Sequence, residues 1–176
     1  MEITLLPFAD LDPDIPLWLA QAFEQHGIGS RLAPAVPLPD AAYDPERGQY
    51  VADALLAAAR TVTGHPVLGL IDRDLYSDDL NFVFGIAEMG GRAAIVATPR
   101  LALGADAALF RERLLKEALH ELGHVFGLPH CTEPLCVMYF SNSLADTDRK
   151  QAAFCARCLS GLPAEFAAFA LRRLPS

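Results

Sequence analysis

The alternation of hydrophobic and polar residues divides the first half of the chain into short strands and amphipathic helices. Apolar runs bounded by turn residues indicate strands, and apolar residues that recur every three or four positions indicate helices. The predicted order is strand, helix, strand, helix, strand, at residues 3–8, 15–25, 30–36, 49–62 and 67–71. Prolines around the second strand limit its pairing and make residues 38–47 a loop. This order predicts an α/β fold.

The second half of the chain begins with two further apolar segments and continues with a long helix. Residues 81–88 and 92–97 read as strands, and the glycines between them suit a hairpin turn. One of the two is expected at an antiparallel edge of the sheet. A helix is predicted over residues 105–126 and a final short helix over 163–173, with an irregular segment between them.

The long helix carries two histidines and a glutamate on one face. His120 and His124 are four residues apart, so a helix places their imidazoles about 40° from each other and both can bind one zinc ion. Glu121 lies beside them and is predicted to act as general base towards a water molecule. The opposite face of the helix is apolar and should pack on the core. Its residues are Leu115, Ala118, Leu119, Leu122, Val125 and Phe126.

A third histidine follows after a predicted turn. Gly127 is suited to the positive φ that ends a helix, and Pro129 prevents the helix from resuming. His130 can therefore return towards His120 and His124 as a third ligand. Three protein ligands leave one position for water or substrate, which is the pattern of a catalytic zinc site.

Four cysteines, all after residue 130, form two closely spaced pairs. Cys131 and Cys136 make one pair, and Cys155 and Cys158 make the other. Each pair can offer two thiolates to one ion, so a closed structural zinc site is favoured. Two disulfides or a redox pair are the alternatives. The N-terminus lacks the features of a signal peptide, and paired cysteines in a reducing compartment more often bind metal.

Taken together, the HExxHxxGxxH segment, Met138 and the four cysteines resemble the archaemetzincins, a branch of the metzincin clan of metallopeptidases. The resemblance implies that Met138 lies in a Met-turn beneath the catalytic zinc. Sixteen residues, 139–154, separate Met138 from the last cysteine pair, one fewer than in the family pattern. Tyr139 follows Met138 directly, whereas the tyrosine that assists catalysis in other metzincins stands two residues after the methionine. That role is therefore not assigned to Tyr139.

The resemblance also implies the architecture and the way a substrate is bound. We expect a single metzincin-like domain over residues 1–176, of the α/β (α+β) class, with an upper subdomain of about 1–127 and a lower one of about 128–176. The upper part holds a mixed twisted sheet, and the lower part is irregular and stapled by the cysteine-bound zinc. Residues 81–88 are assigned as the edge strand that pairs with an extended peptide substrate.

Composition narrows the possible partners. The 176 residues are 52% hydrophobic, which favours a folded protein over a disordered one. A net charge of -8 provides no basic surface for nucleic acid, and no apolar stretch is long enough to span a membrane. A cytoplasmic location is expected, and a monomer is favoured although the sequence leaves the oligomeric state open. Glu117 could shape the cleft, but it is interpreted as an exposed helix carboxylate, and His26 as a surface or capping residue.

The predicted activity is hydrolysis of peptide bonds by a zinc metallopeptidase that holds two zinc ions, one catalytic and one structural. Two other functions fit the same motif. One is a zinc-containing peptide-binding protein with little or no activity, and the other is a zinc amidase that acts on a small substrate. The length of the cleft distinguishes the amidase from a peptidase, because a peptidase needs an extended edge beside the zinc and an amidase of this kind needs a closed pocket. The sequence does not specify the substrate, the position of cleavage or any mechanism of latency.

Overall fold

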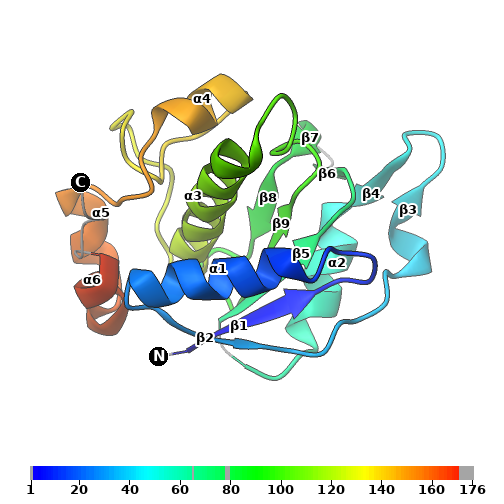
Figure 1. Cartoon of the computed structure of the whole chain (residues 1–176), viewed down its shortest axis with the longest axis horizontal. Coiled ribbons are helices and arrows are strands. Elements are labelled where there is room, and N and C mark those ends of the chain that lie inside the picture. Colours follow the sequence, from blue (N-terminus) through cyan, green and yellow to red (C-terminus); the bar gives the residue numbers. More distant parts are fainter. Residues whose placement is uncertain (1, 65, 78–79, 171–176) are drawn as a thin grey trace.

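The computed structural model describes residues 2–64, 66–77 and 80–170, which fold around two β-sheets (Figure 1). The strands are β1 (Glu2–Pro7), β2 (Gly29–Leu32), β3 (Tyr43–Asp44), β4 (Gln49–Val51), β5 (Val67–Ile71), β6 (Leu75–Ser77), β7 (Leu80–Val83), β8 (Gly85–Ala87) and β9 (Ala93–Ala97). The helices are α1 (Asp14–Gln25), the 3-10 turn η1 (Asp40–Ala42), α2 (Ala52–Arg60), α3 (Ala107–Val125), α4 (Leu144–Arg149), α5 (Ala156–Gly161) and α6 (Ala164–Ala170).

The larger sheet has the order β2-β1-β5-β9-β8. Its first four strands are parallel, and β8 pairs antiparallel with β9 at the edge. A mixed sheet with an antiparallel edge strand was predicted, and this part of the prediction is confirmed. The predicted second strand is shorter than expected: β2 ends at Leu32, before Pro34, so the prolines do not interrupt its parallel pairing with β1.

A smaller sheet of order β3-β4-β6-β7 corrects two sequence predictions. Residues 81–88 do not form one strand, because β7 turns to pair with β6 while β8 joins the larger sheet. The helix predicted over 49–62 begins only at Ala52, since Gln49–Val51 pairs as β4 with β6. Both differences arise from pairing with β6, a strand of three residues that has no periodicity to reveal it.

Both faces of the larger sheet are covered by helices. Along β9, Ala93, Ile95 and Ala97 pack in the same cluster as α2, whereas Ala94 and Val96 pack with α1 and α3 on the other face. Successive side chains of a strand point to opposite faces, so a continuous apolar run is what a sheet buried on both sides requires. The fold is thus a layered α/β arrangement in which α1 and α3 lie in front of the sheet in Figure 1.

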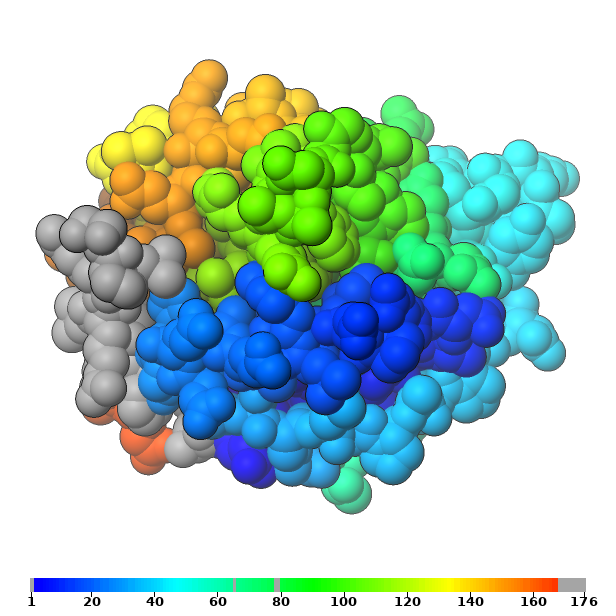
Figure 2. All heavy atoms as spheres, viewed as in Figure 1, coloured from blue at the N-terminus to red at the C-terminus, as the bar shows by residue number. Residues whose placement is uncertain are grey.

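The long helix α3 is exposed at its start and buried from Arg113 to its end. Its first turns reach the surface between α1 and α4 (Figure 2). Asp106 caps the helix by accepting a hydrogen bond from the Leu109 N–H at 2.8 Å. The predicted apolar stripe packs into the core as expected. Because α3 contacts β8, β9 and α4, it joins the sheet to the C-terminal part of the chain.

The C-terminal part contains more regular structure than the sequence predicted. The short helices α4 and α5 lie between the histidine segment and α6. A capping box starts α4: the Ser143 side chain accepts a hydrogen bond from the Asp146 N–H, and the Asp146 side chain accepts one from the Ser143 N–H. The helix predicted over 163–173 is observed as Ala164–Ala170, and positions 171–173 lie outside the described residues. Within the described residues, no helix is long and apolar enough to cross a membrane.

Candidate metal centres and cleft

The end of α3 is a Schellman turn that brings His130 back towards the other two histidines. Gly127 has φ 88°, its N–H donates to the His124 carbonyl, and the Leu128 N–H donates to the Gly123 carbonyl, both at 2.9 Å. The positive φ reverses the chain, so that His130 returns to the face of α3 that carries His120. The role predicted for Gly127 in this turn therefore has a direct geometric basis.

The three imidazoles converge through their Nε2 atoms. His124 Nε2 lies 3.1 Å from His120 Nε2 and 3.3 Å from His130 Nε2. Ligands of one tetrahedral zinc at a Zn–N distance of about 2.0–2.1 Å are separated by roughly 3.3 Å. These nitrogens thus have the spacing of ligands to a single ion, and the residues present fit zinc.

Backbone carbonyls orient two of these rings. The Nδ1 atom of His120 lies 2.7 Å from the Val137 carbonyl oxygen, and that of His124 lies 2.7 Å from the Leu128 carbonyl oxygen. A carbonyl accepts a hydrogen bond, so Nδ1 carries the proton and Nε2 keeps its lone pair for a metal. Burial lowers the pKa of His124 to about 4 and that of His120 well below its ordinary value. Both rings are therefore neutral, as metal ligation requires.

Glu121 is buried beside the histidines, under the edge strand. Burial raises the pKa of its carboxyl well above the ordinary value, and the neighbouring Glu117 carboxylate raises it further. Gly85 of β8 lies directly against this carboxylate. A bound cation would act in the opposite direction and favour the ionised form. The side chain and the three imidazoles line the same pocket.

The histidines and Glu121 line a pocket of about 430 Å³. Residues 80–87, on and between β7 and β8, line it together with Met89 and residues 140–142. Phe140 packs on the His130 ring with 4.8 Å between ring centroids. Tyr139 is not among the lining residues, which agrees with giving it no catalytic role. The lining thus includes most of the segment 81–88 that the sequence assigned to substrate.

The four cysteines form a second cluster. Their Sγ atoms all lie within 4.8 Å of one another, and those of Cys131 and Cys155 are 3.8 Å apart. A tetrahedral zinc with Zn–S bonds of about 2.3 Å separates its sulfurs by roughly 3.8 Å, whereas a disulfide would need about 2.05 Å. All four cysteines are free thiols. The arrangement fits a structural zinc and does not fit the alternative of two disulfides.

Hydrogen bonds to the sulfurs support this second site. The pKa of Cys131 would be raised by burial, but donation from the Glu133 N–H and from Arg157 Nη2 lowers it to about 7. The Cys155 N–H donates to Cys136 Sγ at 3.3 Å. Such donors stabilise thiolates, which are the form that binds zinc. The contribution of Arg157 is a contact across 26 residues that no sequence motif revealed.

Met138 connects the two centres. Its side chain is fully buried, and its carbonyl oxygen accepts a hydrogen bond from the Cys131 N–H at 2.8 Å. Its Sδ atom packs so closely on Gly123 that a Cβ there would overlap it. This contact explains a glycine in the last turn of α3, where alanine would otherwise be favoured. Met138 thus supports the helix turn that bears His120 and His124.

One prediction about an ionisable residue is wrong. Glu117 is 3% exposed, not a solvated helix carboxylate, and it forms an ion pair with Lys150 at 2.8 Å. His26, expected as a surface or capping residue, is the C-cap of α1 and is 6% exposed, so the capping alternative is confirmed. Helical spacing could not reveal the burial of Glu117, because its partner lies 33 residues away.

Comparisons with known proteins identify the family of this chain. The family model described as "Peptidase family M54" matches residues 34–163, which include all seven candidate metal ligands. The chain belongs to peptidase family M54. It is 53% identical to the archaemetzincin of Methanopyrus kandleri over 167 residues, covering 90% of this chain and 93% of that protein. It is 40% identical to the archaemetzincin of Pyrococcus furiosus, covering 91% of each.

A solved structure extends the relationship to the fold. The crystal structure of archaemetzincin from Archaeoglobus fulgidus superposes with a TM-score of 0.84 at 38% identity, covering 92% of this chain and all of that one. The resemblance to archaemetzincins drawn from the sequence is confirmed, as is the predicted fold class. Membership of peptidase family M54 supports the assignment of this chain as a zinc metallopeptidase.

Proposed function

We propose that this chain is a metzincin-type peptidase in which His120, His124 and His130 hold the catalytic zinc and Glu121 is the general base. The observation that carries the proposal is the convergence of the three Nε2 atoms beside the buried Glu121 carboxylate. A zinc ion at this position supplies Lewis-acid chemistry, which lowers the pKa of water and polarises a carbonyl group. The four cysteines hold a second zinc that has no part in the chemistry.

Glu121 moves the proton in this mechanism. Its carboxylate accepts a proton from the attacking water and then delivers it to the nitrogen of the leaving amine. The Val137 and Leu128 carbonyls keep the two helix histidines in the tautomer that leaves Nε2 free. Burial under β8 keeps bulk water away from the carboxylate and so strengthens its interactions with the reacting groups.

The substrate is an extended peptide lying along β8. Within the described residues this strand pairs only with β9, so its other edge is available for strand addition. The lining of the cleft by residues 80–87 and Met89 supports a peptide over a small amide, which would be held in a closed pocket. β7 also lines the cleft next to β8, although it belongs to the smaller sheet.

The test compares the wild type with Glu121→Gln, which keeps the shape of the side chain but removes the base. Zinc content and cleavage of a peptide library are measured for both, with the exposed Glu24→Gln as matched control. We expect two zinc ions per chain in all three proteins and a fall in cleavage of about 100-fold or more in Glu121→Gln alone. Equal cleavage by wild type and Glu121→Gln would remove Glu121 from the mechanism, and wild-type protein that binds the peptides without cleaving them would show a binding protein.

A further inference from the structure

The inner wall of the cleft contains a buried ion pair that the mechanism does not use. Glu117 lies one turn before His120 on α3 and lines the pocket, with its side chain 4% exposed. Lys150 Nζ contacts Glu117 Oε1 at 2.8 Å, and the lysine side chain is fully buried. Thr147 Oγ1 donates to the same oxygen at 3.4 Å. Both contacts fall on Oε1, which leaves Oε2 for a group in the pocket.

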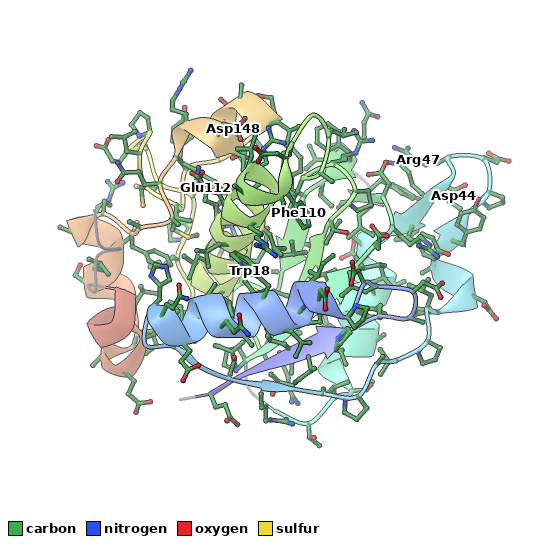
Figure 3. The ribbon with its side chains drawn as sticks, viewed as in Figure 1. Trp18, Asp44, Arg47, Phe110, Glu112 and Asp148 are labelled. Carbon is green, nitrogen blue, oxygen red and sulfur yellow. The ribbon has the colours of Figure 1, made fainter. Side chains whose placement is uncertain are left out.

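The segment just before Lys150 contacts α3 through Asp148. Arg113 forms a two-pronged ion pair with Asp148 at 2.6 and 2.8 Å, and Lys116 Nζ donates to the Asp148 carbonyl at 3.2 Å. Asp148 and the start of α3 lie next to each other at the top of Figure 3. These contacts hold the chain next to Lys150 against α3, where the buried ammonium contacts Glu117.

A second polar group in the same pocket lacks a partner. Ser141 lines the pocket, and its hydroxyl is buried without a hydrogen bond to any part of the described chain. Buried polar groups are almost always hydrogen-bonded, so an orphaned one indicates a ligand or a bound water. Together with Glu117, it gives this wall one hydrogen-bond acceptor and one hydroxyl that can donate.

The charge of this wall restricts what can fill it. Glu117 and Lys150 neutralise each other, so a charged side chain placed there would be buried without a counter-ion. An apolar side chain would leave Ser141 and Glu117 Oε2 unpaired. An amide both donates and accepts, and it carries no charge. It therefore satisfies every condition that the wall imposes.

We propose that Glu117 and Ser141, which line the cleft, together with Lys150 buried behind Glu117, select substrates with an asparagine or glutamine side chain at one position near the cleaved bond. The proposal rests on the proposed peptidase function. The amide nitrogen donates to Glu117 Oε2, and the amide oxygen accepts from the Ser141 hydroxyl. The balance of charge between Glu117 and Lys150 sets the preference for a neutral occupant.

The test uses the zinc-loaded chain and peptides randomised in turn at each of the three positions on either side of the cleaved bond. The wild type should prefer Gln or Asn over Leu, Glu and Lys by about tenfold at one position. Glu117→Gln leaves Lys150 unbalanced and should shift that position towards Glu by about tenfold. Lys150→Met leaves Glu117 unbalanced and should shift it towards Lys or Arg by a similar factor.

Arg149→Met is the matched control, because it also removes a positive charge next to Lys150 in the sequence, but Arg149 is exposed and does not line the pocket. It should keep the wild-type order of preference. Should Lys150→Met fail to fold, the isosteric Glu117→Gln and the small change Ser141→Ala decide the question. Ser141→Ala should reduce the preference of Gln over Leu without favouring either charge. An unchanged order in Glu117→Gln, or a wild-type preference for a charged or apolar residue at every position, would overturn the proposal.

Peptide affinities, measured apart from cleavage, test this proposal independently of the proposed function. The same peptides are titrated against zinc-loaded Glu121→Gln, alone and combined with Glu117→Gln, and their affinities are measured by calorimetry. Selective binding of Gln and Asn peptides, with a shift towards Glu in the double variant, supports the proposal even where the wild type cleaves nothing. Affinities that do not depend on the side chain, or no binding at all, overturn it even where cleavage is observed.

Discussion

Gly85 lies so close to Glu121 that a Cβ on Gly85 would come within 2.6 Å of Glu121 Oε1. The edge strand and the buried carboxylate are thus in direct contact, and only a glycine leaves room for both. Gly85 belongs to β8, and Glu121 lies 36 residues later on α3. The position of the proposed general base is therefore set by the strand proposed to bind substrate.

Gly85→Ala should displace the Glu121 carboxylate and reduce peptide cleavage by about 10- to 100-fold, because a shift of about 1 Å in a reacting group has effects of this size. Zinc content should stay at the wild-type value, since no metal ligand is moved. Cleavage rates and zinc analysis on the purified proteins test this. Gly104→Ala serves as control, because its φ of +64° makes alanine strained while no atom lies within 4 Å of the new Cβ. It should lose stability but keep its rate, and a Gly85→Ala protein with the wild-type rate would disprove the argument.

Gly123→Ala should destabilise the protein by about 1–3 kcal/mol, because the added Cβ overlaps Met138 Sδ and overpacking has costs of this size. Helix propensity alone predicts the opposite, a gain of about 1 kcal/mol. Urea unfolding measures the difference. In the double variant with Met138→Ala, the two effects should be less than additive, since removing the thioether makes room for the Cβ. Simple additivity would show that the contact carries no energy.

The pair formed by Arg113 and Asp148 predicts a dependence of stability on pH. Hydrogen bonding from Arg113 lowers the pKa of the Asp148 carboxyl below its usual value of 3.8. A carboxyl with a lowered pKa in the folded state stabilises it above the unfolded pKa, and this contribution is lost as the pH falls through the folded value. The melting temperature of the wild type should therefore fall below about pH 4 more steeply than that of Asp148→Asn. Asp53→Asn, at an exposed position of α2, should follow the wild-type curve, and identical slopes in all three would refute the prediction.

Cys158→Ser should remove the structural zinc and also weaken the catalytic site. The Val137 carbonyl that orients His120 lies between Cys136 and Met138, so loosening the cysteine cluster releases a support of the histidine centre. We expect zinc content to fall below two per chain and the remaining ion to be lost to a chelator at least about tenfold faster. Release is followed with a chromogenic zinc indicator, and Ser160→Ala on the same helix is the control. A variant that keeps one zinc with wild-type release kinetics would show that the two centres are independent.

The histidine site could be predicted from the sequence because the residues that specify it lie close together along the chain. Two ligands lie on adjacent turns of one helix, and Gly127 with Pro129 specifies the turn that returns the third. Gly123 also lies inside this motif, but its reason is the contact with Met138, fifteen residues later. Spacing within a helix contains no information about what packs on it, so the motif leaves that position unspecified.

The parts of the site that sequence reasoning missed depend on pairing between distant segments. The ion pair between Glu117 and Lys150 spans 33 residues, and helical periodicity places Glu117 on a face without saying whether that face is covered. The division of residues 81–88 into β7 and β8 has a similar cause. Both halves are apolar, and only the presence of β6 beside the first half decides which sheet each one joins.

The hydrogen bond from the Cys131 N–H to the Met138 carbonyl closes the chain between His130 and Tyr139 into a loop shared by both metal centres. The eleven-residue histidine segment is therefore not a portable unit. A designer who transplanted it into another helical scaffold would obtain three ligands but not the carbonyl that aligns His120. A transferable zinc site from this protein has to extend at least to Tyr139 and bring along the cysteines that hold that loop in place.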